Sequence, residues 1–138
     1  MTKLDCILLI DDSEVDNFYH KMIINDCNVV DKVRIAENGL EGLDYLNNKG
    51  RFENADENPT PQIIFLDINM PKMNGFEFLE EYKNLPEELR ANHCIMMLTT
   101  SINPKDKLKA ESYGILSGYS TKPLEKEVLI KLIEDHFS

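Results

Sequence analysis

The chain has 138 residues and a formal net charge of −10, from 25 acidic and 15 basic residues. At this length one domain is expected, and 42% hydrophobic with 29% charged residues is ordinary for a soluble globular protein. The acidic balance argues against direct nucleic-acid binding, which needs a basic surface. No signal peptide is visible and no segment approaches the ~18 apolar residues of a membrane span. We therefore expect a cytoplasmic protein that binds neither nucleic acid nor membrane.

Apolar runs alternate with helical periodicity through the first half of the chain. Residues 4–10 form an apolar run broken only by Asp5, as expected for a strand buried on both faces. Ser13 is a suitable N-cap for the next helix, and Asp16 complements its dipole. Residues 32–36 then predict a short strand, and Asn38-Gly39 opens a second helix. The apolar residues that recur at helical spacing in the first helix are Val15, Phe18, Tyr19, Met22 and Ile23.

The second half repeats the alternation after a long polar connection over residues 47–61. A strand is predicted at 63–66, followed after Gly75 by a helix that Pro86 interrupts. Another strand is predicted at 94–98, with a helix from Pro104 to about Tyr113. Residues 117–121 predict the last strand and residues 124–137 an amphipathic last helix. This alternation predicts an α/β fold, a three-layer sandwich with a five-stranded parallel sheet and helices on both faces.

Polar residues stand where the apolar strands end. Asp11 and Asp12 follow the first strand, Asp67 the third, Thr99 the fourth and Lys122 the fifth. Because the carboxyl ends of parallel strands share one edge of the sheet, we expect these side chains to converge there. Asp11 and Asp12 alone could be a helix cap, and Asp67 alone a turn residue.

Together, three carboxylates would repel one another unless a cation lay among them. An all-oxygen ligand set with room for water fits Mg²⁺ better than Zn²⁺, and the backbone carbonyl of Asn69 can face the same ion. A phosphoryl group on Asp67 would then have Mg²⁺, Lys122 and the Thr99 hydroxyl on its oxygens. These are the parts needed for phosphoryl transfer to a carboxylate.

The motifs that carry this chemistry resemble the receiver domain of two-component response regulators. They are Asp11-Asp12, the stretch Asp67-Ile68-Asn69-Met70-Pro71-Lys72-Met73-Asn74-Gly75, Leu98-Thr99-Thr100-Ser101 and Lys122-Pro123. The resemblance covers the whole chain in the right order and implies the flavodoxin-like strand order 2-1-3-4-5, which the chemotaxis receiver exemplifies. The long polar loop and the Leu-Thr-Thr-Ser run are similar to single-domain regulators paired with bacterial phytochromes.

The resemblance also implies roles for individual residues. Asp67 would be the phosphoacceptor, with Asp12, Asp67 and the Asn69 carbonyl as direct Mg²⁺ ligands and Asp11 acting through water. Thr99 would be the switch hydroxyl, although the adjacent Thr100 is an alternative. Tyr119 would be the aromatic residue that turns inward with the switch; a half-buried core tyrosine is the other interpretation. The segment before Tyr119 is one residue longer than the common pattern.

A receiver domain is a phosphoacceptor rather than an enzyme, so we expect only Mg²⁺-dependent self-phosphorylation from small donors and slow self-dephosphorylation. The resemblance implies that a histidine kinase or histidine phosphotransfer protein supplies the phosphoryl group. The chain leaves no room for an output domain, so residues 1–138 are expected to be a single receiver. It would signal to a downstream partner, or form a homodimer, through the fourth helix (104–113), fifth strand (117–121) and fifth helix (124–137).

Three other functions use a similar fold or nucleophile. A haloacid-dehalogenase-type phosphatase needs a second carboxylate two residues after the nucleophile, where this chain has Asn69. A flavodoxin-type cofactor binder needs a phosphate cradle rich in Gly, Ser and Thr after the first strand, where the acidic run 11–16 would repel phosphate. A receiver-fold scaffold that binds proteins without phosphorylation stays open, but the sequence does not favour it because every residue needed for phosphorylation is present.

Overall fold

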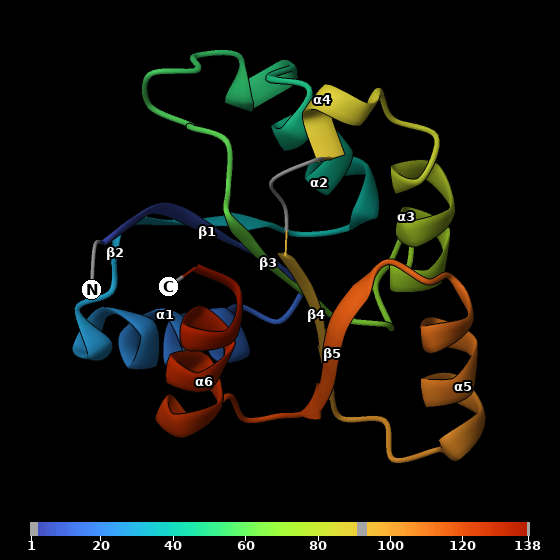
Figure 1. Ribbon diagram of the computed structural model, residues 1–138. Helices are drawn as coiled ribbons and strands as arrows, with labels where there is room; N and C mark the ends of the chain where they lie inside the picture. The colour runs from blue at the N-terminus through green and yellow to red at the C-terminus, as the bar shows by residue number, and fades with distance from the viewer. Residues whose placement is uncertain (1–2, 91–93, 138) are drawn as a thin grey trace.

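The computed structural model describes residues 3–90 and 94–137 and contains one parallel sheet (Figure 1). The order β2-β1-β3-β4-β5, with every neighbouring pair parallel, confirms the predicted flavodoxin-like order. The central strands carry apolar side chains on both faces of the sheet, as a sheet covered on both sides requires. The strands are β1 (Leu4–Ile10), β2 (Val30–Ala36), β3 (Ile63–Leu66), β4 (Cys94–Thr99) and β5 (Leu116–Thr121).

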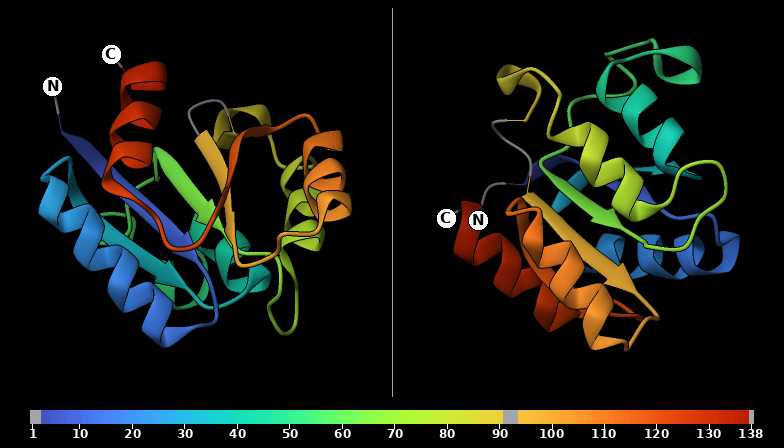
Figure 2. Two further views of the ribbon diagram at one scale, coloured as in Figure 1. Left: turned by 90° about the horizontal axis from the view of Figure 1, so that it is seen from below. Right: turned by 90° about the vertical axis from the view of Figure 1, so that its right-hand side faces the viewer.

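Helices cover both faces of the sheet and complete the predicted three-layer α/β sandwich (Figure 2). One layer consists of α1 (Glu14–Cys27) and α6 (Lys126–Phe137). Both helices share a core cluster with Ile7 and Leu9 of β1, Ile63 and Phe65 of β3, and Met96 and Leu98 of β4. The other layer consists of α2 (Gly39–Leu46), α3 (Gly75–Tyr82) and α5 (Pro104–Ser112). The connections contain the short η1 (Gly50–Phe52) and α4 (Glu87–Arg90). The sequence interpretation did not foresee α4, which follows Pro86.

The predicted strand positions agree closely with the observed ones, and a bulge explains the extra residue before Tyr119. Along the β4–β5 ladder, Ile95 pairs with Leu116 but the next residue, Met96, pairs with Gly118. Ser117 is therefore the additional residue of a β-bulge, a device that absorbs an insertion without changing the register beyond it. Tyr119 and the residues after it return to regular pairing with β4.

The apolar residues at helical spacing in α1 do not face the core. Val15 is 78% exposed and Phe18 is 74% exposed, whereas the buried residues of this helix are Asn17, His20 and Ile24. An amphipathic pattern normally turns its apolar face inward. Here the inward face begins with polar side chains because it lies over the polar end of the sheet. The usual expectation that the apolar face of an amphipathic helix is the buried one is thus wrong for α1.

The long polar connection is fixed to the body of the protein by hydrogen bonds. The Tyr45 hydroxyl donates to the Pro59 carbonyl oxygen at 2.8 Å, and the Arg34 guanidinium donates to the Glu57 carbonyl oxygen at 2.9 Å. Phe52 is buried and its ring packs edge-on against Tyr45. Within residues 3–90 and 94–137, no helix is both long enough and apolar enough to cross a membrane.

Candidate functional site

Backbone pairing continues one residue past the strands and brings the polar residues to one edge. The Asp11 amide donates to the Ala36 carbonyl, and the Asp67 amide donates to the Ile10 carbonyl, each at 3.0 Å. The Lys122 amide donates to the Thr99 carbonyl at 2.8 Å. These bonds extend the ladder, so the side chains that follow β1, β3 and β5 leave the sheet at the same level. The convergence expected from the sequence is present in the structure.

Three carboxylates form a cluster at this edge. One oxygen from each of Asp11, Asp12 and Asp67 lies within 4.8 Å of the others. Asp11 and Asp67 are buried, whereas Asp12 is exposed, so the cluster opens to solvent on one side. Such a set of hard oxygen ligands, negatively charged and partly open to water, suits a small divalent cation. The structure thus brings together the three carboxylates that the sequence proposed as metal ligands.

Lys122 reaches this cluster from the end of β5. Its ammonium lies 2.6 Å from Asp11 Oδ2 and 3.5 Å from Asp67 Oδ2, and only 9% of its side chain is exposed. A third carboxylate, Asp16 on α1, lies 2.7 Å from the same ammonium. Burial opposes the charged form, but the hydrogen bonds to Asp11 and Asp16 raise the pKa of Lys122 above its ordinary value. The ammonium is therefore a permanent positive charge in the site.

Asp67 is held in an unfavourable environment for a carboxylate. Burial, followed by the nearby charge of Asp11, raises the pKa of Asp67, while Lys122 and hydrogen bonds from Ile68 and Thr99 oppose the rise. The Ile68 amide donates to Asp67 Oδ1 at 2.9 Å, so the oxygen on the Lys122 side is Oδ2. A carboxylate whose pKa is shifted, within a cluster of like charges, is a usual feature of a reactive site.

The two adjacent threonines at the end of β4 have different surroundings. Thr99 is fully buried and its Oγ1 accepts a hydrogen bond from the Ser101 amide at 3.2 Å, whereas Thr100 is exposed. Of the two threonines, Thr99 is the one whose hydroxyl forms a hydrogen bond that lowers the pKa of Asp67. This geometry favours Thr99 over Thr100 as the hydroxyl nearest the acceptor. Its role as a switch stays a prediction.

The two remaining residues of the predicted site lie at its margin. Asn69 is exposed in the turn after β3, and its contribution of a carbonyl ligand stays a prediction. Tyr119 on β5 is partly buried, and its hydroxyl donates to the Ser101 carbonyl at 3.4 Å. The tyrosine thus contacts the loop that follows Thr99, a position from which it can respond to movement of that loop.

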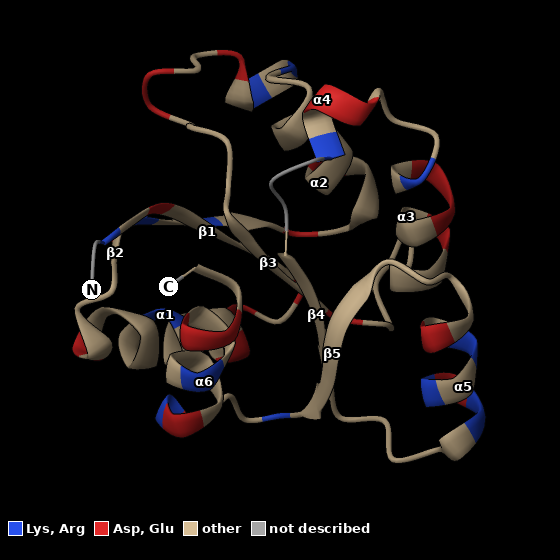
Figure 3. Ribbon diagram, in the orientation of Figure 1, with Lys and Arg blue, Asp and Glu red and all other residues tan. Residues whose placement is uncertain are grey.

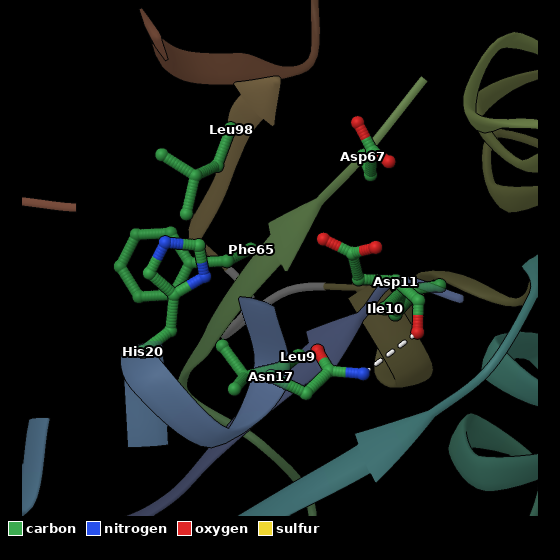
Figure 4. A pocket seen from close by; sticks show the side chains of 8 residues that line it. All are labelled: Leu9, Ile10, Asp11, Asn17, His20, Phe65, Asp67 and Leu98. Atoms are coloured by element: carbon green, nitrogen blue, oxygen red, sulfur yellow. Dashed lines mark hydrogen bonds between the residues drawn. The ribbon is translucent and has the colours of Figure 1, made fainter. Parts of the chain in front are cut away.

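Sequence reasoning missed three polar residues of α1 that line or touch the site. Asp16 binds Lys122, and the Asn17 side-chain amide donates to the Asp11 carbonyl at 2.9 Å. Figure 4 shows Asn17 and His20 around a cavity of about 10 Å³ that Asp11 and Asp67 also line. Asn17 Oδ1 is buried there and lacks a hydrogen-bond partner, and the cavity is about the size that one water needs. The spacing of Asn17, His20 and Ile24 was the available signal for this buried face.

Comparison with known proteins agrees with this geometry. The family model described as "Response regulator receiver domain" matches residues 7–134. The chain belongs to the response regulator receiver family. Its role as a phosphoacceptor in two-component signalling follows from that membership.

The most similar relatives cover almost the whole of this receiver. Response regulator Rcp1 of Synechocystis is 30% identical over 128 residues, which are 93% of this chain and 83% of that protein. A two-component response regulator from Cytophaga hutchinsonii is 31% identical, with a TM-score of 0.83 over 96% of both chains. The bacteriophytochrome response regulator AtBRR is 31% identical, with a TM-score of 0.79 over 97% of this chain and 93% of that one. The predicted similarity to phytochrome-paired regulators is thus confirmed.

One solved relative contains a metal ion. The Mn²⁺-bound form of Rcp1 is 30% identical, with a TM-score of 0.73 over 95% of this receiver and 92% of that chain. The carboxylate cluster of this receiver offers the oxygen ligands that such a cation requires. Response regulators as a class interact with histidine kinases and with downstream partners.

Proposed function

We propose that Asp67 accepts the phosphoryl group, and that Asp11, Asp12, Asp67 and the Asn69 carbonyl hold a Mg²⁺ ion. One observation carries the proposal: the buried Asp67 carboxylate belongs to the three-carboxylate cluster and lies 3.5 Å from the Lys122 ammonium. Four carboxylates, Asp16 included, outnumber the single ammonium, so the site has a net negative charge that a dication would balance. When bound, Mg²⁺ would act as a Lewis acid toward the phosphoryl oxygens.

The residues that would assist the transfer step are already grouped around Asp67. A carboxylate oxygen of Asp67 forms a bond to the phosphorus of a phosphohistidine, and the phosphorus–nitrogen bond breaks. Its electron pair stays on the imidazole nitrogen, which takes a proton from water. Lys122 balances charge on the phosphoryl oxygens, and the Thr99 hydroxyl is available as a donor to one of them. The predicted lack of further enzymatic turnover is part of this proposal, because Asn69 stands where a phosphatase needs a second acid.

We further propose that the phosphoryl donor, a histidine kinase or histidine phosphotransfer protein, docks on the exposed apolar face of α1. Val15 and Phe18 on this face are largely exposed although they are large and apolar. A groove of about 440 Å³ lies beside Phe18, and its lining also includes Ile35 and the site residue Asp12. An apolar surface that adjoins the acceptor site is suited to a protein that must bring a histidine to Asp67. We also propose a cytoplasmic location, where an ATP-dependent kinase would have access to the protein.

For output, we propose the surface of α5, β5 and α6, which correspond to the fourth helix, fifth strand and fifth helix of the sequence prediction. Leu108 is exposed on α5 and Ile102 in the loop before it, and α5 carries several lysines (Figure 3). Tyr119 connects this surface with the loop after Thr99. Either a downstream protein or a second copy of the chain would bind there. Identical oligomeric state and partner affinity with and without fluoroberyllate, a phosphoryl mimic, would count against this surface.

The acceptor assignment can be tested with a small donor. The protein is incubated with Mg²⁺ and acetyl phosphate, and its intact mass is measured. We expect the wild type to gain one phosphoryl group and Asp67→Asn to gain none, whereas Asp44→Asn, an exposed aspartate on α2, should behave like the wild type. If the wild type gains no mass while a known receiver does, the chain acts as a protein-binding scaffold without phosphorylation.

A further inference from the structure

Asp16 is the least expected member of the site. It lies in the first turn of α1, where its amide donates to the N-cap Ser13 Oγ at 3.2 Å. An acidic residue there would ordinarily serve only the helix dipole. Instead, its Oδ2 accepts a hydrogen bond from Lys122 Nζ at 2.7 Å. That hydrogen bond is the main reason why the pKa of Asp16 is lowered, so the side chain is charged at neutral pH.

The three contacts of Lys122 are unequal. The distances to Asp11 and Asp16, 2.6 and 2.7 Å, are those of strong charge-assisted hydrogen bonds. The 3.5 Å to Asp67 is too long for one. The ammonium therefore lies on the α1 side of the site, away from the acceptor. Asp16 contributes to this position without being part of the carboxylate cluster that could hold a cation.

We propose that Asp16 is a positioning residue that restrains Lys122 on the α1 side of the site and so limits how tightly the receiver holds a phosphoryl group on Asp67. This inference rests on the proposed function of Asp67 and Lys122. A phosphoryl group draws the ammonium toward Asp67, and Asp16 competes for it. Asp16 also adds negative charge beside both the carboxylate cluster and the position of the phosphoryl oxygens. Loss of its charge favours the anion and disfavours the cation.

Asp16→Asn tests the restraint because the amide keeps the shape and can still accept a hydrogen bond, while the charge is removed. Fluoroberyllate binding is measured at saturating Mg²⁺, and Mg²⁺ binding is measured separately without fluoroberyllate. We expect fluoroberyllate to bind about threefold to fivefold more tightly, the size usual for a partly exposed ion pair, and Mg²⁺ to bind more weakly. A variant that only damaged the site would bind both more weakly.

Glu14→Gln is the matched control, since Glu14 is exposed in the same helical turn and its removal changes the net charge equally. It should leave fluoroberyllate affinity close to that of the wild type. A second readout is the ¹⁵N signal of the Lys122 ammonium, whose protons should exchange with water faster in Asp16→Asn than in Glu14→Gln.

The outcomes separate the two proposals. Tighter fluoroberyllate binding in Asp16→Asn alone supports the restraint. Equal effects in the two variants, or unchanged or weaker fluoroberyllate binding in Asp16→Asn, overturn it and leave the acceptor assignment standing. If the wild type fails to bind fluoroberyllate in the presence of Mg²⁺, the proposed function fails, and the inference fails with it.

Discussion

At the scale of single residues, the site is a compromise between reactivity and stability. Burial, followed by the like charge of Asp11, raises the pKa of Asp67, although Lys122 lies close by. A carboxylate in such surroundings is less stable when ionised in the folded protein than in the unfolded chain. The proposed phosphoryl transfer needs a nucleophile near a cation, which is a reason to retain this unfavourable group. Residues of this kind are expected to lower stability where they serve function.

Replacement of the acceptor by its neutral isostere should therefore stabilise the protein. Because the folded-state pKa of Asp67 is raised, its ionisation weakens the fold as pH rises above the ordinary value of 3.8. In chelator at neutral pH, we expect Asp67→Asn to increase the free energy of unfolding by about 1 kcal/mol. The gain should shrink as pH falls toward 3.8. Urea unfolding across this range measures it, with Asp44→Asn as the control. A less stable Asp67→Asn at neutral pH would contradict the explanation.

At the scale of elements, α1 has two unlike faces, and the sequence pattern alone could not say which one is buried. The apolar residues recur at helical spacing, but so do Asn17, His20 and Ile24. Only the position of the helix over the polar end of the sheet decides between them. In contrast, β1 and β3 were predicted with their observed bounds, since a continuous apolar run with polar neighbours has few other interpretations.

The exposure of the α1 apolar face has a direct consequence for stability. Phe18→Ser should change the free energy of unfolding by less than about 0.5 kcal/mol, as exposed positions usually do. Ile24→Ala, six residues further along on the buried face, should lower it by roughly 2–4 kcal/mol because a cavity opens in the core. Phe18→Ser should also slow phosphorylation by a histidine kinase while leaving that by acetyl phosphate unchanged. A large loss of stability in Phe18→Ser would place this residue in the core instead.

The junction between β3 and α3 depends on a missing side chain. A Cβ atom at Gly75 would collide with the Asp67 carbonyl oxygen and approach the Ile68 Cα atom to 3.0 Å. Gly75→Ala must therefore shift the backbone of the acceptor itself, and we expect a loss of about 2–3 kcal/mol together with weaker fluoroberyllate binding. Gly118→Ala is the control, since its Cβ would meet the flexible end of Met96. Similar losses in the two variants would argue against a special role for this junction.

At the scale of the whole molecule, parallel topology is what made the site predictable. Asp11, Asp67 and Lys122 are far apart in sequence, yet each follows a strand, and parallel strands end at one edge. The sequence predicted the helix α1 but could not predict how this helix packs over the edge. Asp16 and Asn17 enter the site from α1, and their contacts depend on how the helix packs. The bulge at Ser117 was visible only as an extra residue of unknown placement.

The excess of acidic residues predicts a marked response of the entire fold to divalent cations. Repulsion within the carboxylate cluster should be relieved when Mg²⁺ binds the folded state. Mg²⁺ at ten times its dissociation constant should stabilise the protein by about 1.4 kcal/mol, and chelator should reverse the effect. Thermal unfolding with Mg²⁺ or with chelator measures this difference. Asp12→Asn should reduce it strongly; an undiminished shift in that variant would assign the effect to cations bound elsewhere.

The bulge at Ser117 also restricts how this molecule can associate. β5 lies at the edge of the sheet, where unpaired backbone groups could recruit an extended segment from another chain. A bulge bends the edge strand and increases its twist, which spoils the straight template that strand addition requires. A partner of β5 should therefore bind through side chains rather than by extending the sheet. The same extra residue that lengthens the segment before Tyr119 thus makes this edge of the sheet less suited to strand addition.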